Sequence, residues 1–156
     1  MAIGAIAAIS CQDINGQGKV DNSKRPKYKP AAEWKKTLTP EQYDILRQGG
    51  TEAPGTCALA IHQEGTFYCV ARNNPLFVSD KKFESHTGWP SFWQPYAIDS
   101  IILKSDNTLG MARTEVLCAK CEGHLGHVFD DGPPPTHQRY CINGVVLKFI
   151  KKENEN

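Results

Sequence analysis

The chain has 156 residues, of which 22% are charged, and a formal net charge of +1. This length fits one domain with a hydrophobic core, and charges of both signs mixed along the chain argue against a nucleic-acid-binding surface. Six cysteines exceed what the packing of a small domain requires but fall short of a disulfide scaffold, so their number fixes neither the compartment nor the pairing.

The first 33 residues predict a segment outside the folded domain. Residues 1–10 are small and apolar, too few to span a membrane, and resemble the end of an export signal that lacks its basic residues. Cys11 stands where a bacterial lipoprotein signal places the residue that receives the lipid. A periplasmic or lipid-anchored location is therefore favoured slightly over a cytoplasmic one. Residues 13–32 are expected to form a flexible polar linker.

A short helix is predicted near the start of the domain. Thr39 can cap its N-terminus, and Gln42 completes a capping box. The glycines at residues 49–50 end the helix after about eight residues. Tyr43 and Leu46 are expected to face the core.

Beyond this helix the hydrophobic pattern changes to a period of two, which is typical of strands. Turn residues such as those at 64–65 and 106–107 separate the segments. The pattern favours a mainly β domain of antiparallel sheets at residues 34–150, followed by a polar tail at 151–156. The predicted strands are 57–62, 66–71, 99–104, 110–118, 127–129 and 139–150.

The most reactive stretch lies between residues 118 and 143, where three cysteines and three histidines gather. Cysteine is a strong nucleophile as its thiolate. Cys141 is the best candidate, because Arg139 supplies positive charge two residues before it, and His124 and His127 can donate protons.

Cys118 and Cys121 form a C-x-x-C pair, which is typical of half a zinc site or of a redox pair. With Cys69 they are also compatible with an alternative function, a non-catalytic zinc-binding or redox-structural module. The enzyme and the module differ at Cys141 and the histidines, which a structural site does not need.

Three sequence blocks carry a resemblance to a known family: GWPSF at residues 88–92, HLGHVF at 124–129 with DGP at 131–133, and RYCIN at 139–143. They resemble the signature blocks of the B-type peptide methionine sulfoxide reductases, over roughly residues 34–149. The resemblance implies a coiled β core. It also implies reduction of methionine-R-sulfoxide in proteins to methionine, a repair of oxidative damage whose chemistry requires no cofactor.

The resemblance also implies a role for each matching residue. Cys141 would attack the sulfoxide sulfur and become a sulfenic acid, while His124 or His127 protonates the departing oxygen. Trp89 would pack its indole against the methyl group of the substrate. The positions that orient the substrate or tune the nucleophile are matched by Asp131, Arg139 and Asn143.

A sulfenic acid must be resolved by a second thiol before it oxidises further. Many family members carry the resolving cysteine two residues before the tryptophan of GWPSF, where this chain has Thr87. Cys57 is the best substitute, because some relatives have a cysteine near this point. A thioredoxin-like dithiol would then reduce the disulfide. Instead of Cys57, an external reductant, Cys11 or Cys69 could resolve the sulfenic acid.

Zinc-containing relatives bind the metal with two C-x-x-C pairs. In this chain Cys118 and Cys121 form one pair. The other has Cys69 and, at its fourth position, Arg72, whose guanidinium cannot ligate zinc. Three thiolates with a water or a histidine could hold a structural zinc less tightly. We favour free thiols, or a disulfide between Cys69 and either Cys118 or Cys121, slightly over a zinc site. His86 is a second departure from the family pattern.

Overall fold

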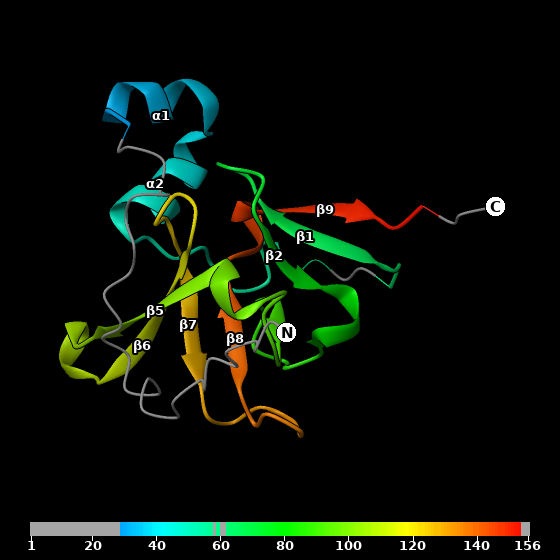
Figure 1. Ribbon diagram of the computed structural model, residues 1–156. Helices are drawn as coiled ribbons and strands as arrows, with labels where there is room; N and C mark the ends of the chain where they lie inside the picture. The colour runs from blue at the N-terminus through cyan, green and yellow to red at the C-terminus, as the bar shows by residue number, and fades with distance from the viewer. Residues whose placement is uncertain (1–28, 58, 60–61, 154–156) are drawn as a thin grey trace, which may run out of the picture.

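The computed structural model describes residues 29–57, 59 and 62–153, so the predicted export segment and Cys11 lie outside the described residues. The protein folds into two β-sheets, with two short helices at one end (Figure 1). The helices are α1 (Ala31–Thr37) and α2 (Pro40–Gln48). Among the described residues, neither helix has the length and apolar character needed to cross a membrane.

The two sheets are antiparallel at every described pairing, which confirms the predicted fold class. The smaller sheet has the strand order β2-β1-β9, and the larger has the order β3-β4-β8-β7-β6-β5. The strands are β1 (Gly65–Cys69), β2 (Pro75–Val78), β3 (Lys82–Phe83), β4 (Ser91–Phe92), β5 (Ile101–Asp106), β6 (Arg113–Cys118), β7 (His124–Phe129), β8 (Arg139–Ile142) and β9 (Leu147–Lys151). Short 3₁₀ segments lie at Ser79–Lys81, Ile98–Ser100, Thr108–Gly110 and Gly144–Val146.

Helix α2 begins and ends as the sequence predicts. The Thr39 hydroxyl accepts from the Gln42 backbone N–H at 3.2 Å, and the Gln42 side chain accepts from the Thr39 N–H at 3.1 Å, which completes the capping box. Gly49 has φ 73°, a left-handed conformation that glycine adopts without steric cost. Ile45 and Leu46 are buried on the face that packs against β7. The helix therefore covers the end of the strand that carries both candidate histidines.

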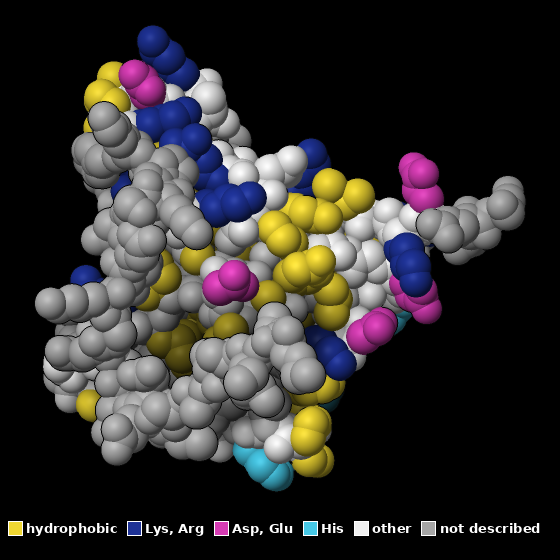
Figure 2. Space-filling model, in the orientation of Figure 1, with side chains coloured by type: hydrophobic (Ala, Val, Ile, Leu, Met, Phe, Trp, Pro, Cys, Tyr) yellow, Lys and Arg dark blue, Asp and Glu magenta, His cyan; other side chains and the backbone are white. Residues whose placement is uncertain are grey.

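Helix α1 was not predicted, and it begins inside the segment interpreted as a linker. Its first residue follows Pro30, and no side chain caps its N-terminus. Seven residues are too few for a stable helix without tertiary packing. Trp34 supplies that packing, since only 3% of its surface is exposed. Lysine and arginine side chains gather over the α1 and α2 end of the molecule (Figure 2).

Two predicted strands need correction, and three strands were not predicted. The predicted strand at 57–62 is wrong at residues 57, 59 and 62, which are not in a strand, and its other residues lie outside the described part of the chain. The predicted strand at 139–150 is two strands, because the 3₁₀ turn at Gly144–Val146 sends β8 and β9 into different sheets. Strands β2, β3 and β4 were missed because two to four residues are too short to show a period.

Three phenylalanine rings join the two sheets. Phe77 on β2 stacks on Phe92 on β4 with ring centroids 4.3 Å apart, and Phe67 on β1 meets Phe92 edge-on at 5.1 Å. All three residues have no exposed surface. Because offset and edge-to-face pairs add to the free energy of burying aromatic surface, this cluster fixes β4 against the smaller sheet. In the larger sheet β4 pairs with β8, which carries Cys141.

Candidate active site

A cavity of about 150 Å³ opens beside β7 and β8. Five residues singled out in the sequence line it, and they come from three separate segments: Trp89, His124, His127, Cys141 and Asn143. The other lining residues are Thr51, Arg113, Gly126, Phe129 and Ile142. The fold therefore brings the candidate nucleophile, both candidate acids and the predicted indole into one pocket.

The two histidines face the cavity together because β7 contains a β-bulge. The register against β6 shifts at Leu117, which pairs with His124, so that Leu125 is the extra residue. Side chains alternate along a regular strand, and residues three positions apart would face opposite sides of the sheet. The bulge returns His124 to the side of His127, and their ring centroids lie 5.4 Å apart.

Each histidine is held by a carboxylate from another strand of the larger sheet, Glu115 on β6 and Asp106 on β5. His124 Nδ1 lies 2.7 Å from Glu115 Oε1, and His127 Nε2 lies 2.8 Å from Asp106 Oδ2. Since a carboxylate only accepts, the facing nitrogen of each ring carries a proton. Burial lowers the pKa of His124, which the Glu115 carboxylate opposes. Hydrogen bonds from Thr108 and from His127 hold the pKa of Asp106 well below its usual range, so this carboxylate is charged.

The sequence analysis missed these two carboxylates and their neighbour Arg113. Arg113 lines the cavity, and its Nη2 lies 3.1 Å from Asp106 Oδ2, the oxygen that also contacts His127. Glu115 offered no signal, because it lies between Thr114 and Val116 as a polar residue on the outer face of a strand would. Asp106 had none, since it was read as a turn residue.

Cys141 lies directly opposite His127 in the register of β8 and β7. Cβ atoms of such cross-strand partners are about 4.5–5.5 Å apart, so a group in the cavity can meet both side chains. Cys141 is half-buried. Burial raises the pKa of its thiol, whereas the Arg139 guanidinium and the Thr87 hydroxyl lower it. Thr87 is therefore a neighbour of the nucleophile.

Arg139 and Asp131 form an ion pair beside the cavity without lining it. Arg139 Nε and Nη2 lie 2.8 Å and 2.9 Å from the two oxygens of Asp131, and this contact raises the pKa of Arg139 and lowers that of Asp131. The guanidinium also lies over the ring of Phe129, 4.5 Å from its centroid. The pair fixes the positive charge near Cys141. Direct contact of either residue with a substrate stays a prediction.

Trp89 and Asn143 are fixed by the backbone of Glu52. Trp89 Nε1 donates to the Glu52 carbonyl at 3.1 Å. The Asn143 side chain accepts from the Glu52 N–H at 3.0 Å and donates to the Leu125 carbonyl at 2.9 Å. The buried Glu52 carboxylate in turn accepts from the Gly144 N–H at 2.7 Å. Because both ends of the Asn143 amide have protein partners, its contacts position the pocket wall, and a role in orienting substrate stays a prediction.

Cys57 packs against the turn that follows the nucleophile and does not line the cavity. A Cβ added to Gly144, three residues after Cys141, would lie 2.0 Å from the Cys57 carbonyl oxygen and 2.9 Å from its Sγ. Glycine is therefore required for this close approach. Cys57 is half-buried. Burial is the largest cause that raises the pKa of its thiol, and the nearby Glu52 carboxylate raises this pKa further.

The three remaining described cysteines form a separate buried cluster. The sulfurs of Cys69, Cys118 and Cys121 all lie within 4.8 Å of one another, and Cys69 Sγ is 3.8 Å from Cys121 Sγ. A tetrahedral zinc site with four sulfurs has edges of about 3.8 Å, so these thiols fit three corners of one. Among the described residues no other cysteine, histidine or carboxylate joins them, and Arg72 cannot ligate. The donor set could hold a metal but does not fit a closed four-sulfur site.

Hydrogen bonds among the three thiols shift their pKa values in opposite directions. The pKa of Cys118 is lowered by hydrogen bonds from Cys121 and from Cys69, and the same contacts with Cys118 raise the pKa values of Cys121 and Cys69. Cys118 is therefore the thiol of the cluster that loses its proton most readily. No disulfide joins any of the five cysteines in the described part of the chain, so the predicted disulfide alternative is not formed here.

The chain matches the SelR domain over residues 38–151. It belongs to the SelR family. Among curated relatives, the peptide methionine sulfoxide reductase MsrB of Leptospira interrogans is 57% identical over 121 residues, which cover 77% of this chain and 92% of that protein. The MsrB of Methanosarcina mazei is 50% identical over 139 residues, covering 88% and 94%. The MsrB of Agrobacterium fabrum is 52% identical over 122 residues, covering 78% and 90%. SelR membership confirms the family that the three sequence blocks predicted.

Proposed function

We propose that this protein is an oxidoreductase that reduces the R epimer of peptide-bound methionine sulfoxide to methionine. Its SelR domain and its relatives named peptide methionine sulfoxide reductase support the reaction class. The observation that carries the proposal is the placement of Cys141 directly opposite His127, in a cavity with the Trp89 indole as a wall.

The first step would transfer the sulfoxide oxygen to Cys141. The Cys141 thiolate attacks the sulfoxide sulfur and forms an S–S bond while His127 supplies a proton to the oxygen from Nδ1, the nitrogen that Asp106 does not hold. The oxygen then bonds to the Cys141 sulfur as the S–O and S–S bonds break. The products are methionine and a Cys141 sulfenic acid, so the substrate sulfur gains the two electrons that the cysteine sulfur loses. Trp89, fixed through its Nε1, would present an apolar face to the substrate methyl group.

The second step would regenerate the thiol through Cys57. The Cys57 thiol condenses with the sulfenic acid to form a disulfide, and water leaves with the oxygen. A thioredoxin-like dithiol then reduces this disulfide by exchange. The packing of Cys57 on Gly144 supports its role, whereas Cys69 is fully buried among the clustered thiols. Cys11 lies outside the described residues, and its lipid modification and the export of the chain stay predictions.

The reaction class is tested with the separated R and S epimers of a methionine sulfoxide peptide and dithiothreitol as the reductant. We expect turnover of the R epimer alone. Turnover of neither epimer by the wild-type protein would favour the non-catalytic module instead.

Recycling is tested with Cys57→Ser under two reductants. The variant should keep its activity with dithiothreitol, which can attack the sulfenic acid directly, and should lose turnover driven by thioredoxin. Equal thioredoxin-driven rates for the variant and the wild type would exclude Cys57 as the resolving thiol. The rate of Cys69→Ser provides the control for a general effect of losing a cysteine.

A further inference from the structure

Two turns of the chain bring the buried cysteines together. One turn begins after Cys69, the last residue of β1, and contains Arg72. The other begins after Cys118, the last residue of β6, and contains Cys121. A structural zinc in a site of two C-x-x-C pairs cross-links such turns through four sulfurs. This chain provides three, so another contact must hold the turns in place.

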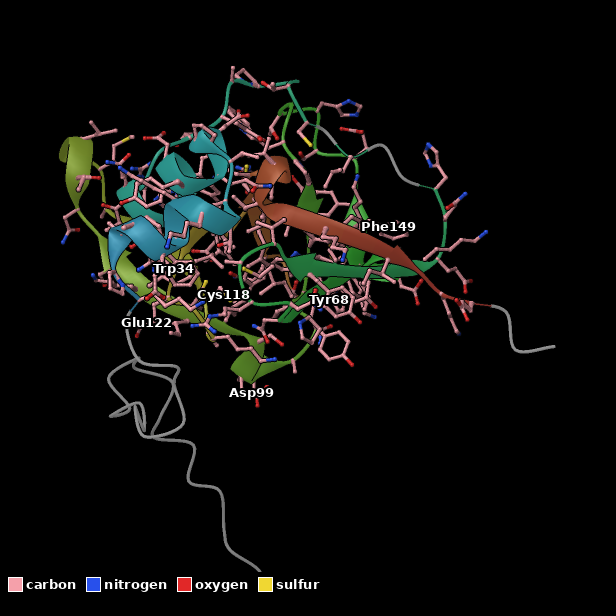
Figure 3. All side chains as sticks on the ribbon, turned by 90° about the horizontal axis from the view of Figure 1, so that it is seen from above. Trp34, Tyr68, Asp99, Cys118, Glu122 and Phe149 are labelled. Carbon is pink, nitrogen blue, oxygen red and sulfur yellow. The ribbon has the colours of Figure 1, made fainter. Side chains whose placement is uncertain are left out.

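Two arginine side chains connect Trp34 of α1 with the two turns. The Arg72 guanidinium lies over its ring, 5.3 Å from the centroid, and so connects α1 with the first turn. The Arg47 guanidinium lies over the same ring at 5.0 Å, and its Nη1 donates to the Cys121 carbonyl at 2.7 Å, which connects α1 with the second turn. Figure 3 shows Trp34 and Cys118 on the side of the molecule that carries the N-terminal helices.

We propose that Arg47, Trp34 and Arg72 replace the fourth metal ligand, and that the three cysteines remain a metal-free cluster in the folded protein. Desolvated guanidinium groups bind an indole face favourably, and a charge-assisted hydrogen bond to a carbonyl fixes the direction of Arg47. Trp34 is 3% exposed, so the ring that both guanidinium groups contact is shielded from water. Arg72 thus takes the position of the fourth cysteine ligand, and its contact with Trp34 compensates for the missing metal bond. This proposal is independent of the proposed function.

Metal content and thermal unfolding of wild type and Arg72→Cys test the first half of the proposal. The wild type, purified from zinc-containing medium, should hold less than about 0.1 zinc per chain, and a chelator should leave its Tm unchanged. Arg72→Cys completes a four-cysteine set and should hold about one zinc per chain, with a Tm that a chelator lowers by several degrees. One zinc per wild-type chain, removed by a chelator with a fall in Tm, would overturn the proposal.

Thiol protection tests the second half. In Trp34→Ala, alkylation of Cys118 and Cys121, followed by mass spectrometry of their peptide, should be at least about 10-fold faster than in the wild type. Trp93→Ala is the matched control, because Lys81 lies over its ring at 4.3 Å and no cluster cysteine is involved. If Trp34→Ala fails to fold, Arg72→Met keeps an aliphatic chain without the guanidinium and should also raise the rate. Unchanged protection in a folded Trp34→Ala or in Arg72→Met would show that the stack does not hold the turns.

Discussion

Cys141 and the three clustered cysteines carry the same thiol group in opposite surroundings. Cys141 lies at a cavity, faces a histidine across two strands and has a guanidinium nearby. The clustered thiols are buried and contact each other, an asparagine side chain and a backbone N–H. The difference between the two regions is access: one sulfur can meet a substrate and a proton donor, whereas the other three can meet only the protein.

The comparison predicts separate effects of removing a sulfur in each region. Cys141→Ser should lower R-sulfoxide turnover by at least about 10³-fold, because a serine hydroxyl is a far weaker nucleophile than a thiolate, and should leave Tm nearly unchanged. Cys118→Ser should lower Tm, because it breaks contacts in a buried cluster, while the folded enzyme keeps its kcat/KM within about threefold. A large loss of kcat/KM in folded Cys118→Ser would contradict this division.

Loss of the proton donor opposite Cys141 should have the next largest effect. His127→Asn should lower kcat/KM by about 10²–10⁴-fold, the usual contribution of a positioned general acid. Asp106→Asn keeps the histidine and weakens the contacts that this carboxylate makes with His127 and Arg113, so its loss should be smaller. Kinetics with the R epimer and dithiothreitol measure both. If His127→Asn stays as active as the wild type while His124→Asn does not, the acid is His124.

A smaller effect is expected from the charges that adjust the nucleophile. Burial raises the pKa of Cys141, and Arg139 lowers it. Arg139→Gln should therefore raise this pKa further, move the ascending limb of the pH–kcat/KM profile to higher pH and lower the rate near pH 7 by about 10-fold. Asp131 raises the pKa of Cys141, so Asp131→Asn should move the limb the opposite way by a smaller amount. A common direction for both variants would show that the ion pair acts through geometry rather than charge.

Local sequence patterns predicted the parts of this protein that contiguous residues determine. The Thr39–Gln42 capping box, the Gly49 cap and the block around Cys141 can each be read from neighbours in the chain. The antiparallel β class also followed, because short segments of alternating or β-branched residues are separated by turn residues. These features depend on interactions within a few residues or on a repeated pattern.

The parts that were missed depend on pairing between distant residues. The carboxylates that hold the histidines lie on β5 and β6, and their placement follows from strand register and from the bulge at Leu125. Helix α1 forms because Trp34 meets arginines from two other segments. A turn breaks the run after Cys141 because the buried Glu52 carboxylate binds the N–H groups of Gly144 and Val145. None of these contacts leaves a pattern in its own stretch of sequence.

The smallest predicted effect concerns stability, and it comes from His124. Burial lowers the pKa of His124, so the unfolded chain takes up its proton at a higher pH than the folded protein does. The folded protein should therefore lose stability as the pH falls below about 6.5, the usual value for histidine, toward the lowered pKa. Thermal unfolding from pH 8 to pH 5 should show a decline in Tm that is about 2 °C smaller in His124→Gln, which carries no titrating ring. An identical decline in the variant would assign the acid sensitivity to other groups, and a steeper one would show that protonated His124 is stabilised by Glu115 more than burial destabilises it.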